Sequence, residues 1–164
     1  MRFFLIGLLI GASLLLLFIN FGSSVRSKQT FSFNHKKHHE QGIECHTCHP
    51  FAKEQTFSGM PTITICMECH QDNITQHPDE EKIRQYHKDG REFEWKRLFQ
   101  QPDDIFFSHR RHVAIARLDC QHCHGEIGQS EKLPTKPSIK MSMEWCMDCH
   151  AKQKANNDCL ACHV

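Results

Sequence analysis

The sequence predicts a mostly irregular fold with short α-helices, built around covalently bound cofactors and preceded by one N-terminal transmembrane helix. Three observations lead to this prediction. Residues 3–21 are almost continuously apolar. All ten cysteines occur in pairs that share one spacing. The chain from about residue 31 to residue 164 is too short to bury an ordinary core beside several large cofactors, so the cofactors must supply much of the interior.

Residues 1–24 are predicted to form an uncleaved membrane anchor. The run from Phe3 to Phe21 contains no charged residue, and about 20 apolar residues in a helix span the bilayer core. A cleavable signal peptide is the alternative. The apolar run exceeds the usual length of a signal core, however, and the residues after it lack a clean small-x-small cleavage site. We therefore expect the anchor to be retained.

Each cysteine pair in residues 25–164 belongs to a C-x-x-C-H motif, which is typical of covalent c-type haem attachment. The two thiols add to the porphyrin vinyl groups, and the following histidine binds the iron. Structural zinc needs two pairs converging on one metal, and disulfides would leave the constant spacing unexplained. We therefore predict five haem c groups. The thioether residues are Cys45, Cys48, Cys66, Cys69, Cys120, Cys123, Cys146, Cys149, Cys159 and Cys162, and the proximal iron ligands are His49, His70, His124, His150 and His163.

An internal repeat, about residues 31–76 and 105–150, offers candidates for the distal ligands. Each half contains F-x-H-x-x-H, then one haem motif, then a second motif of the form C-M-[E/D]-C-H. The fifth motif, residues 159–163, is an addition at the C-terminus. Each half thus has two spare histidines for two haems. Residues three apart on a helical turn point to the same side, so one turn can reach two neighbouring irons.

This arrangement resembles the small tri- and tetrahaem cytochromes of sulfate- and metal-reducing bacteria. The resemblance implies that the first histidine ligates the haem of the nearest motif and the second ligates the next haem. Carried onto this sequence, it pairs His35 with His49, His38 with His70, His109 with His124, and His112 with His150.

The fifth haem has no such histidine partner. The same resemblance puts its distal ligand just before the preceding motif, where Met143 is the first candidate and Met141 the second. Methionine sulfur is an accepted sixth ligand that raises the reduction potential, although methionine is also ordinary core filler. His87 and His77, in the segment between the two halves, remain alternatives.

The connecting segment contains one predicted helix. Pro78 and the three acids after it are typical of a helix start, and Gly90 is a helix stop. Phe93 and Trp95 follow, and the sequence alone leaves open whether they pack on haem edges or on a partner.

A closer resemblance covers nearly all of residues 31–164. It rests on W-K-R with P-D seven residues after the tryptophan, on F-S-H-R-R-H-V, and on M-E-W-C-M-D-C-H. These motifs resemble the pentahaem subunit of alternative complex III, a family of membrane-bound quinol-oxidising complexes. The resemblance implies three kinds of partner: an iron–sulfur subunit related to molybdopterin oxidoreductases, polytopic quinol-binding subunits, and a monohaem cytochrome c. The chain would then be no enzyme by itself, but the electron-transfer subunit of a (mena)quinol:acceptor oxidoreductase that passes electrons to a periplasmic cytochrome or terminal oxidase.

Other functions fit the sequence less well. A self-contained, membrane-anchored quinol dehydrogenase that feeds a periplasmic reductase is the main alternative, but in that family the first motif is followed by x-Met, whereas Pro50 and Phe51 follow it here. The net charge of +1, with scattered basic residues, gives no indication of nucleic-acid binding. Because haem c is attached after export, we expect the anchor in the cytoplasmic membrane and residues 25–164 on its periplasmic side.

Overall fold

The computed structural model describes residues 31–163 of the chain. The predicted anchor, residues 1–24, lies outside these residues. Between residues 31 and 163, none of the helices has both the length and the apolar character that crossing a bilayer requires.

Short helices joined by irregular segments make up the described chain, as the sequence predicts. The one β-type pairing among these residues is an isolated antiparallel bridge between Ile105 and His163. The α-helices are α2 (His35–Glu40), α3 (Cys45–Cys48), α4 (Ile63–Met67), α5 (Pro78–Lys88), α6 (Cys120–His124) and α7 (Met143–Lys152); η1 (Arg111–Ile115) is a π-helical turn, and η2 (Ile127–Gln129) and η3 (Cys159–Ala161) are 3-10 turns.

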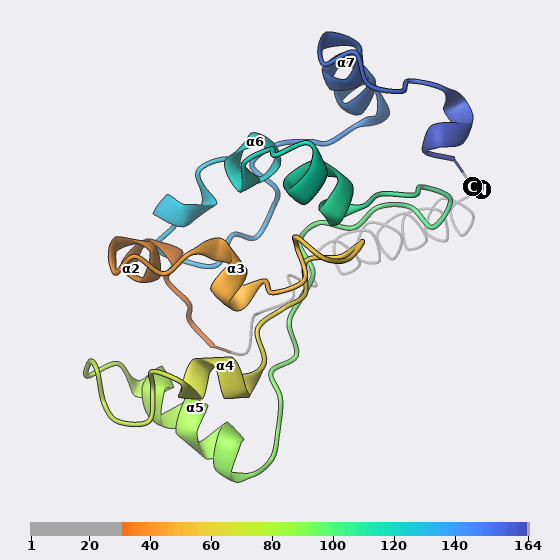
Figure 1. The fold of residues 1–164 in the computed structure, drawn as a ribbon. Coiled ribbons are helices and arrows are strands. Elements are labelled where there is room, and N and C mark those ends of the chain that lie inside the picture. Colours follow the sequence, from red (N-terminus) through yellow and green to blue (C-terminus); the bar gives the residue numbers. More distant parts are fainter. Residues whose placement is uncertain (1–30, 164) are drawn as a thin grey trace, which may run out of the picture.

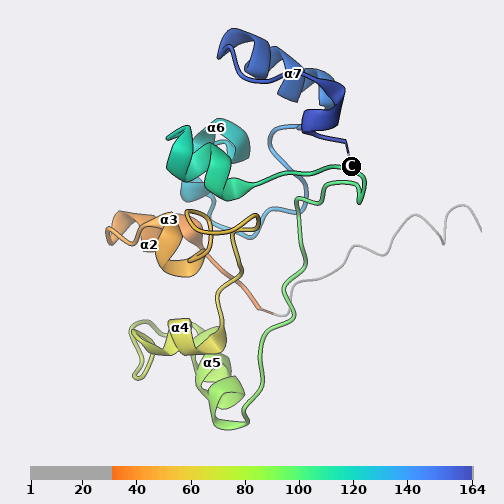
Figure 2. The same cartoon turned by 45° about the vertical axis from the view of Figure 1, so that its right-hand side comes forward.

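The helices are stacked in tiers. Figures 1 and 2 both show α4 and α5 in the lowest tier, α2 and α3 above them, then α6, and α7 at the top. After α5, an extended segment returns from the lowest tier to the level of α6. The first half of the repeat thus runs downward from α2 to α4, and the second half runs upward from α6 to α7.

Helix α5 confirms the helix predicted after His77. Pro78 occupies its first turn, and acidic side chains in that turn interact favourably with the helix dipole. The side chain of His77 caps the start by accepting a hydrogen bond from the backbone amide of Asp79. The helix ends at Lys88, and Gly90 follows in the left-handed region at a φ of 64°.

A small aromatic core lies between α4, α5 and the extended segment after them. Phe31, Ile63, Ile83 and Phe93 are buried there. Trp95 packs at its edge, where its indole N–H donates a hydrogen bond of 2.7 Å to the carbonyl of Pro61. Phe93 and Trp95 therefore pack within the polypeptide, which answers the question that the sequence left open.

Elsewhere the described chain has little protein core. Besides Glu80 and the four core residues, the buried residues in the described chain are Ala52, Pro61 and Ser108, whereas nine large apolar side chains are exposed. Leu160, inside the fifth motif, is 84% exposed. A thin core with exposed apolar side chains is what the sequence predicts for a chain whose interior is completed by cofactors.

Candidate functional site

All five C-x-x-C-H motifs fold as a single helical turn. In the first, second and fifth motifs the histidine amide donates to the carbonyl of the first cysteine, at 2.9 to 3.0 Å. The third motif is helix α6 itself, and the fourth lies within α7. One turn brings the two cysteines and the histidine to neighbouring positions on the helix surface. Each motif therefore presents two thiols and one imidazole together, as attachment of one haem requires.

None of the ten cysteines forms a disulfide, so all ten thiols are available. Burial, together with the neighbouring Cys48 thiol, raises the pKa of the Cys66 thiol to about 11. Burial also raises the pKa of the thiols of Cys48, Cys120, Cys123 and Cys146. Thioether formation would replace these groups, which are costly to ionise where they lie, with uncharged sulfur. In the described part of the chain, no three His, Cys, Asp or Glu side chains are grouped so as to hold a bare metal ion.

The histidines of the two repeat halves face histidines of the motifs. Ring centroids lie 6.2 Å apart for His38 and His70, 6.4 Å for His109 and His124, and 6.0 Å for His112 and His150. Two imidazoles that ligate one ion from opposite sides have centroids about 6 Å apart, since each metal–nitrogen bond is about 2 Å. Three of the four predicted pairs therefore leave a gap that fits an iron ion.

In the fourth predicted pair, His49 lies near enough to His35 to affect its pKa. His35 is the first residue of α2, one turn before His38. Burial, and then the neighbouring His49 and His38, lower the pKa of His35 to about 4. His35 is therefore neutral at pH 7, with a ring nitrogen lone pair available to a metal.

Most of these histidines have their Nδ1 atom held by a hydrogen bond. His49 donates from Nδ1 to the carbonyl of Gly59 at 2.8 Å, and His150 donates to Asn156 at 2.6 Å. The same bond runs from His38 to Asn34 (2.8 Å), from His109 to Thr56 (3.0 Å) and from His112 to Ser108 (2.8 Å). A donor at Nδ1 leaves Nε2 unprotonated and orients the ring, which is the usual support for a metal-ligating histidine.

Three of the other four histidines have a different environment at Nδ1. The Nδ1 of His35 lies 3.4 Å from the hydroxyl oxygen of Ser130 rather than from a carbonyl. The Nδ1 of His163 lies 3.6 Å from the carboxylate of Asp104. The Nδ1 of His70 is buried without a hydrogen-bond partner among the described residues.

Two phenylalanines pack against the predicted distal histidines, contacts that the sequence analysis missed. Phe33 stacks on His38, with centroids 4.4 Å apart and planes 20° apart, and meets His35 edge-on. Phe107 stacks on His112 at 4.6 Å and 23° in the second half. Each phenylalanine opens its F-x-H-x-x-H copy, so its repetition at that position was the signal that could have revealed it.

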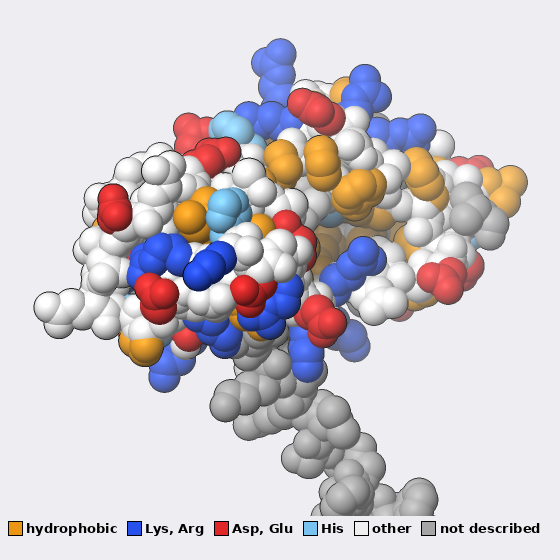
Figure 3. All heavy atoms as spheres, turned by 90° about the horizontal axis from the view of Figure 1, so that it is seen from below, with side chains coloured by type: hydrophobic (Ala, Val, Ile, Leu, Met, Phe, Trp, Pro, Cys, Tyr) orange, Lys and Arg blue, Asp and Glu red, His pale blue; other side chains and the backbone are white. Residues whose placement is uncertain are grey.

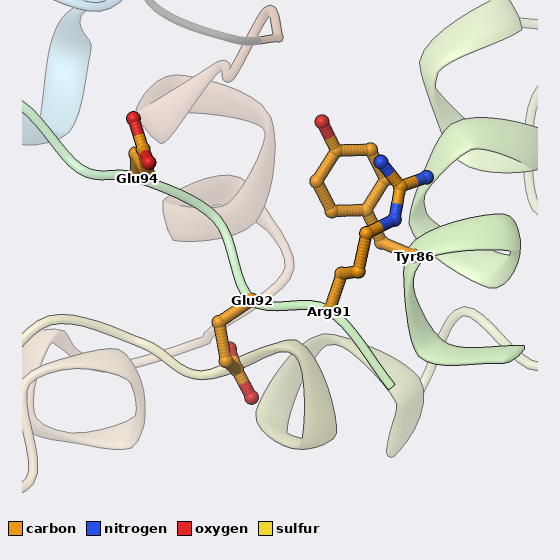
Figure 4. Close-up of a pocket in the computed structure, with 4 residues that line it drawn as sticks. All are labelled: Tyr86, Arg91, Glu92 and Glu94. Carbon is orange, nitrogen blue, oxygen red and sulfur yellow. The ribbon is translucent and has the colours of Figure 1, made fainter. Parts of the chain in front are cut away.

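Another residue that the sequence did not single out, Glu92, supports the second motif. Its carboxylate accepts a hydrogen bond of 2.7 Å from the amide of Ile63, the first residue of α4. Glu92 also borders an open hollow of about 420 Å³, which Tyr86, Arg91 and Glu94 line as well (Figure 4). The guanidinium of Arg91 lies 4.1 Å above the Tyr86 ring. None of the predicted haem residues lines this hollow.

The structure separates the candidates for the fifth distal ligand. Met143 is the first residue of α7, one turn before Cys146, and is 58% exposed. His77 and His87 belong to the start and end of α5, in the lowest tier, whereas η3, within the fifth motif, lies near the top (Figures 1 and 2). The methionines before the fourth motif are therefore nearer candidates in this fold than either histidine.

Charged side chains do not segregate by sign on the face seen in Figure 3. Lys and Arg alternate there with Asp and Glu, and apolar side chains gather beside them. The pattern agrees with the net charge of +1. This face thus lacks the single-sign field that steers a charged partner.

Two comparisons with known proteins bear on this site. Residues 105–164 match the family model described as cytochrome c7 and related cytochrome c. The chain is also similar to the multihaem cytochrome c subunit of a menaquinone reductase from Nitratidesulfovibrio vulgaris. The two are 32% identical over 163 residues, an alignment that covers 84% of this chain and 78% of the relative. The family match begins where the second half of the repeat begins and includes the last three motifs.

Proposed function

The chain belongs to the multihaem cytochrome c family, and on that premise we propose that it is an electron-transfer subunit of a membrane-bound, quinone-linked oxidoreductase complex. The observation that carries the proposal is the set of histidine pairs at about 6 Å, one member of each pair belonging to a C-x-x-C-H motif. Haem c, when bound, supplies an iron that gains and loses one electron.

We propose haem attachment at all five motifs. Each motif supplies two free thiols and a histidine on one helical turn, and this holds for the fifth motif as for the first. For four motifs, a second imidazole from the F-x-H-x-x-H segments is the proposed distal ligand. Two strong ligands on an iron leave no position for a substrate, so these residues favour electron transfer over catalysis by this chain alone.

The proposed complex is of the alternative complex III type. The resemblance noted above implies an iron–sulfur subunit, polytopic quinol-binding subunits and a monohaem cytochrome c as partners, with residues 1–24 anchoring the chain in the cytoplasmic membrane. Electrons would then pass from quinol to a periplasmic cytochrome or terminal oxidase.

In a second candidate function, electrons pass through the same haems in the opposite direction. The relative from Nitratidesulfovibrio vulgaris is named as a subunit of a menaquinone reductase, which is the specific observation that favours it. In that case electrons enter through a periplasmic donor and leave to menaquinone. The residues that hold the haems are the same in both cases.

One purification tests whether the chain acts within a complex or alone. The full-length chain, carrying an affinity tag, is solubilised from membranes in mild detergent, and the proteins that co-purify are identified by mass spectrometry. We expect an iron–sulfur subunit and polytopic subunits. A lone chain that reduces its haems with quinol would support the self-contained quinol dehydrogenase instead.

The direction of electron flow is then measured on the same preparation. Reduction of the haems by menaquinol, followed by oxidation by a periplasmic cytochrome, is expected for the alternative complex III type. Menaquinone reduction by the pre-reduced complex, without the forward reaction, would favour the second candidate. A preparation that lacks covalent haem would refute both.

A further inference from the structure

The positions of the motifs in space differ from their order in the sequence. In each half of the repeat, one helical turn carries the proposed distal histidines of two motifs. Helix α2 leads directly into the first motif, where the amide of Ile43 donates to the carbonyl of His38 at 3.2 Å, and the ring centroid of His38 lies 6.2 Å from that of His70 in the second motif. The effect of His49 on the pKa of His35, on the same turn, agrees with this placement, so the first and second motifs are neighbours.

The second half repeats this relationship for the third and fourth motifs. His109 faces His124 at 6.4 Å, and His112, one turn later, faces His150 at 6.0 Å. A direct contact joins the same two motifs, since the Nε2 of His122 lies 3.7 Å from the sulfur of Cys149. The third and fourth motifs are therefore also neighbours.

The two halves meet through their first motifs. The amide of His109 donates to the carbonyl of Thr56, in the loop that follows the first motif, at 3.0 Å. Across the same junction, the amide of Lys36 donates to the carbonyl of Ser130 at 3.1 Å, and its ammonium lies 3.2 Å from the carboxylate of Glu131. These contacts place the first motif of the sequence beside the third.

The thiols at this junction agree with that placement. Burial and then the adjacent Cys45 thiol raise the pKa of Cys120, so these two sulfurs are close. The pKa of His124 is lowered first by burial and then by the imidazoles of His109 and His49. Imidazoles from both halves of the repeat therefore lie near one another here.

The fifth motif attaches to the fourth. The Nδ1 of His150 donates to the carbonyl of Asn156 at 2.6 Å, and the side-chain amide of Asn157 donates to the carbonyl of Met147 at 3.1 Å. These two bonds fold the short linker back along α7, so that η3 follows the fourth motif directly. Burial and then the neighbouring Cys162 thiol raise the pKa of Cys146, which agrees with this contact.

We propose that the five haem sites form an unbranched row in the order 66–70, 45–49, 120–124, 146–150 and 159–163. The second and fifth motifs of the sequence are then its two ends, and the halves of the repeat are joined head to head. Figures 1 and 2 show the same succession from α4 through α3 and α6 to α7. An electron donor and an acceptor that contact opposite ends would use the full row.

The junction between the halves is tested first, by zero-length carbodiimide cross-linking of the full-length holoprotein and mass spectrometry of its peptides. The Lys36–Glu131 ion pair should yield a covalent link between segments 95 residues apart. Glu131→Gln should abolish this link and leave the Lys152–Asp148 link within α7 unchanged. If the Lys152–Asp148 link forms in the wild-type protein and the Lys36–Glu131 link does not, the row is overturned.

The order is tested second, by a redox titration followed through the NMR signals of each haem. The largest pairwise interactions are expected between the second and first, first and third, third and fourth, and fourth and fifth motifs. An equally large interaction between the second motif and the fourth or fifth would overturn the row.

Because the inference rests on the proposed haem content, the holoprotein mass is measured first. A mass short of the expected gain of about 3 kDa would overturn that content and the row together, whereas five haems in another order would overturn the row alone.

Discussion

The imidazole rings of His109 and His124 are parallel, with 1° between their planes and 6.4 Å between their centroids. The rings of the next pair, His112 and His150, are 38° apart at 6.0 Å. The mutual orientation of two imidazoles would affect the electronic structure of an iron ligated by both, and burial favours the neutral form of His109 and His124 by lowering the pKa of each. Two histidines three residues apart thus face two different partners.

Replacing His109 and His112 separately by alanine is expected to disturb different haems. Each variant loses one axial ligand, so one of five haems should become high-spin and about a fifth of the low-spin signal should disappear. EPR spectroscopy and a potentiometric titration of each variant measure the loss. His46→Ala is the control, because His46 is exposed and its Nδ1 lies 3.0 Å from the carboxylate of Glu44 at the surface. Identical spectra for H109A and H112A would refute the assignment.

Glycine at position 59 is expected to be required for the first site. Gly59 has a φ of +78°, its carbonyl accepts the bond from His49, and an added Cβ would lie 2.8 Å from the Phe51 ring. Gly59→Ala should therefore combine backbone strain of about 1–2 kcal/mol with overpacking of about 1–3 kcal/mol. Gly42→Ala is a matched control, since Gly42 has a φ of +76° with nothing within 4 Å of the added Cβ. Chemical denaturation of both holoproteins measures the difference, and equal losses would contradict the role of Phe51.

The buried carboxylate of Glu80 is expected to make the α4–α5 tier sensitive to acid. It accepts hydrogen bonds from the hydroxyl of Thr75 at 2.6 Å and from the amides of Thr75 and Ile74 at 2.9 Å. The Thr75 hydroxyl, and then the two amides, lower the pKa of Glu80. A lowered folded-state pKa gives stability that is complete above the unfolded-state pKa and is lost as the pH falls through the folded-state value.

Glu80→Gln should therefore lower the thermal unfolding midpoint at pH 7 and reduce its fall between about pH 5 and pH 3. Glutamine keeps the shape but presents only one acceptor oxygen. Melting curves at several pH values measure the effect, with Glu54→Gln, an exposed position, as the control. An E80Q variant with the same pH profile as the wild-type protein would show that the carboxylate does not act in this way.

The features that the sequence predicts depend on residues that lie close together along the chain. The bounds of α5 follow from Pro78, the acids after it and Gly90, all within 13 residues. The histidines of α2 and of residues 109–112 face motif histidines because F-x-H-x-x-H has the spacing of one helical turn. Spacing of this kind can be interpreted without knowing the rest of the fold.

What the sequence could not predict depends on contacts between distant segments. Ser130 lies 95 positions from His35, and no local signal links the two residues. Phe93 and Trp95 have the same aromatic character whether they pack on a porphyrin or on Phe31, so composition could not distinguish the two. The head-to-head joining of the halves is likewise invisible in a repeat, because a repeat shows what each half contains and not how the halves meet.

The carboxylate of Asp104 is expected to tune the fifth haem. It lies 3.6 Å from the Nδ1 of His163, the only predicted proximal histidine in the described chain with an acidic neighbour at that nitrogen. A carboxylate there makes the imidazole a more basic ligand and stabilises the oxidised iron. Asp104→Asn should therefore raise the reduction potential of this haem. Both side chains are substantially exposed, so solvent weakens the effect, and a rise on the order of 30 mV is expected.

Asp103→Asn is the control, because it removes the same charge one residue away. A titration with NMR assignment of each haem measures the shift, which should shrink at high salt. Equal shifts in D104N and D103N would show that net charge, and not the contact with His163, sets the potential.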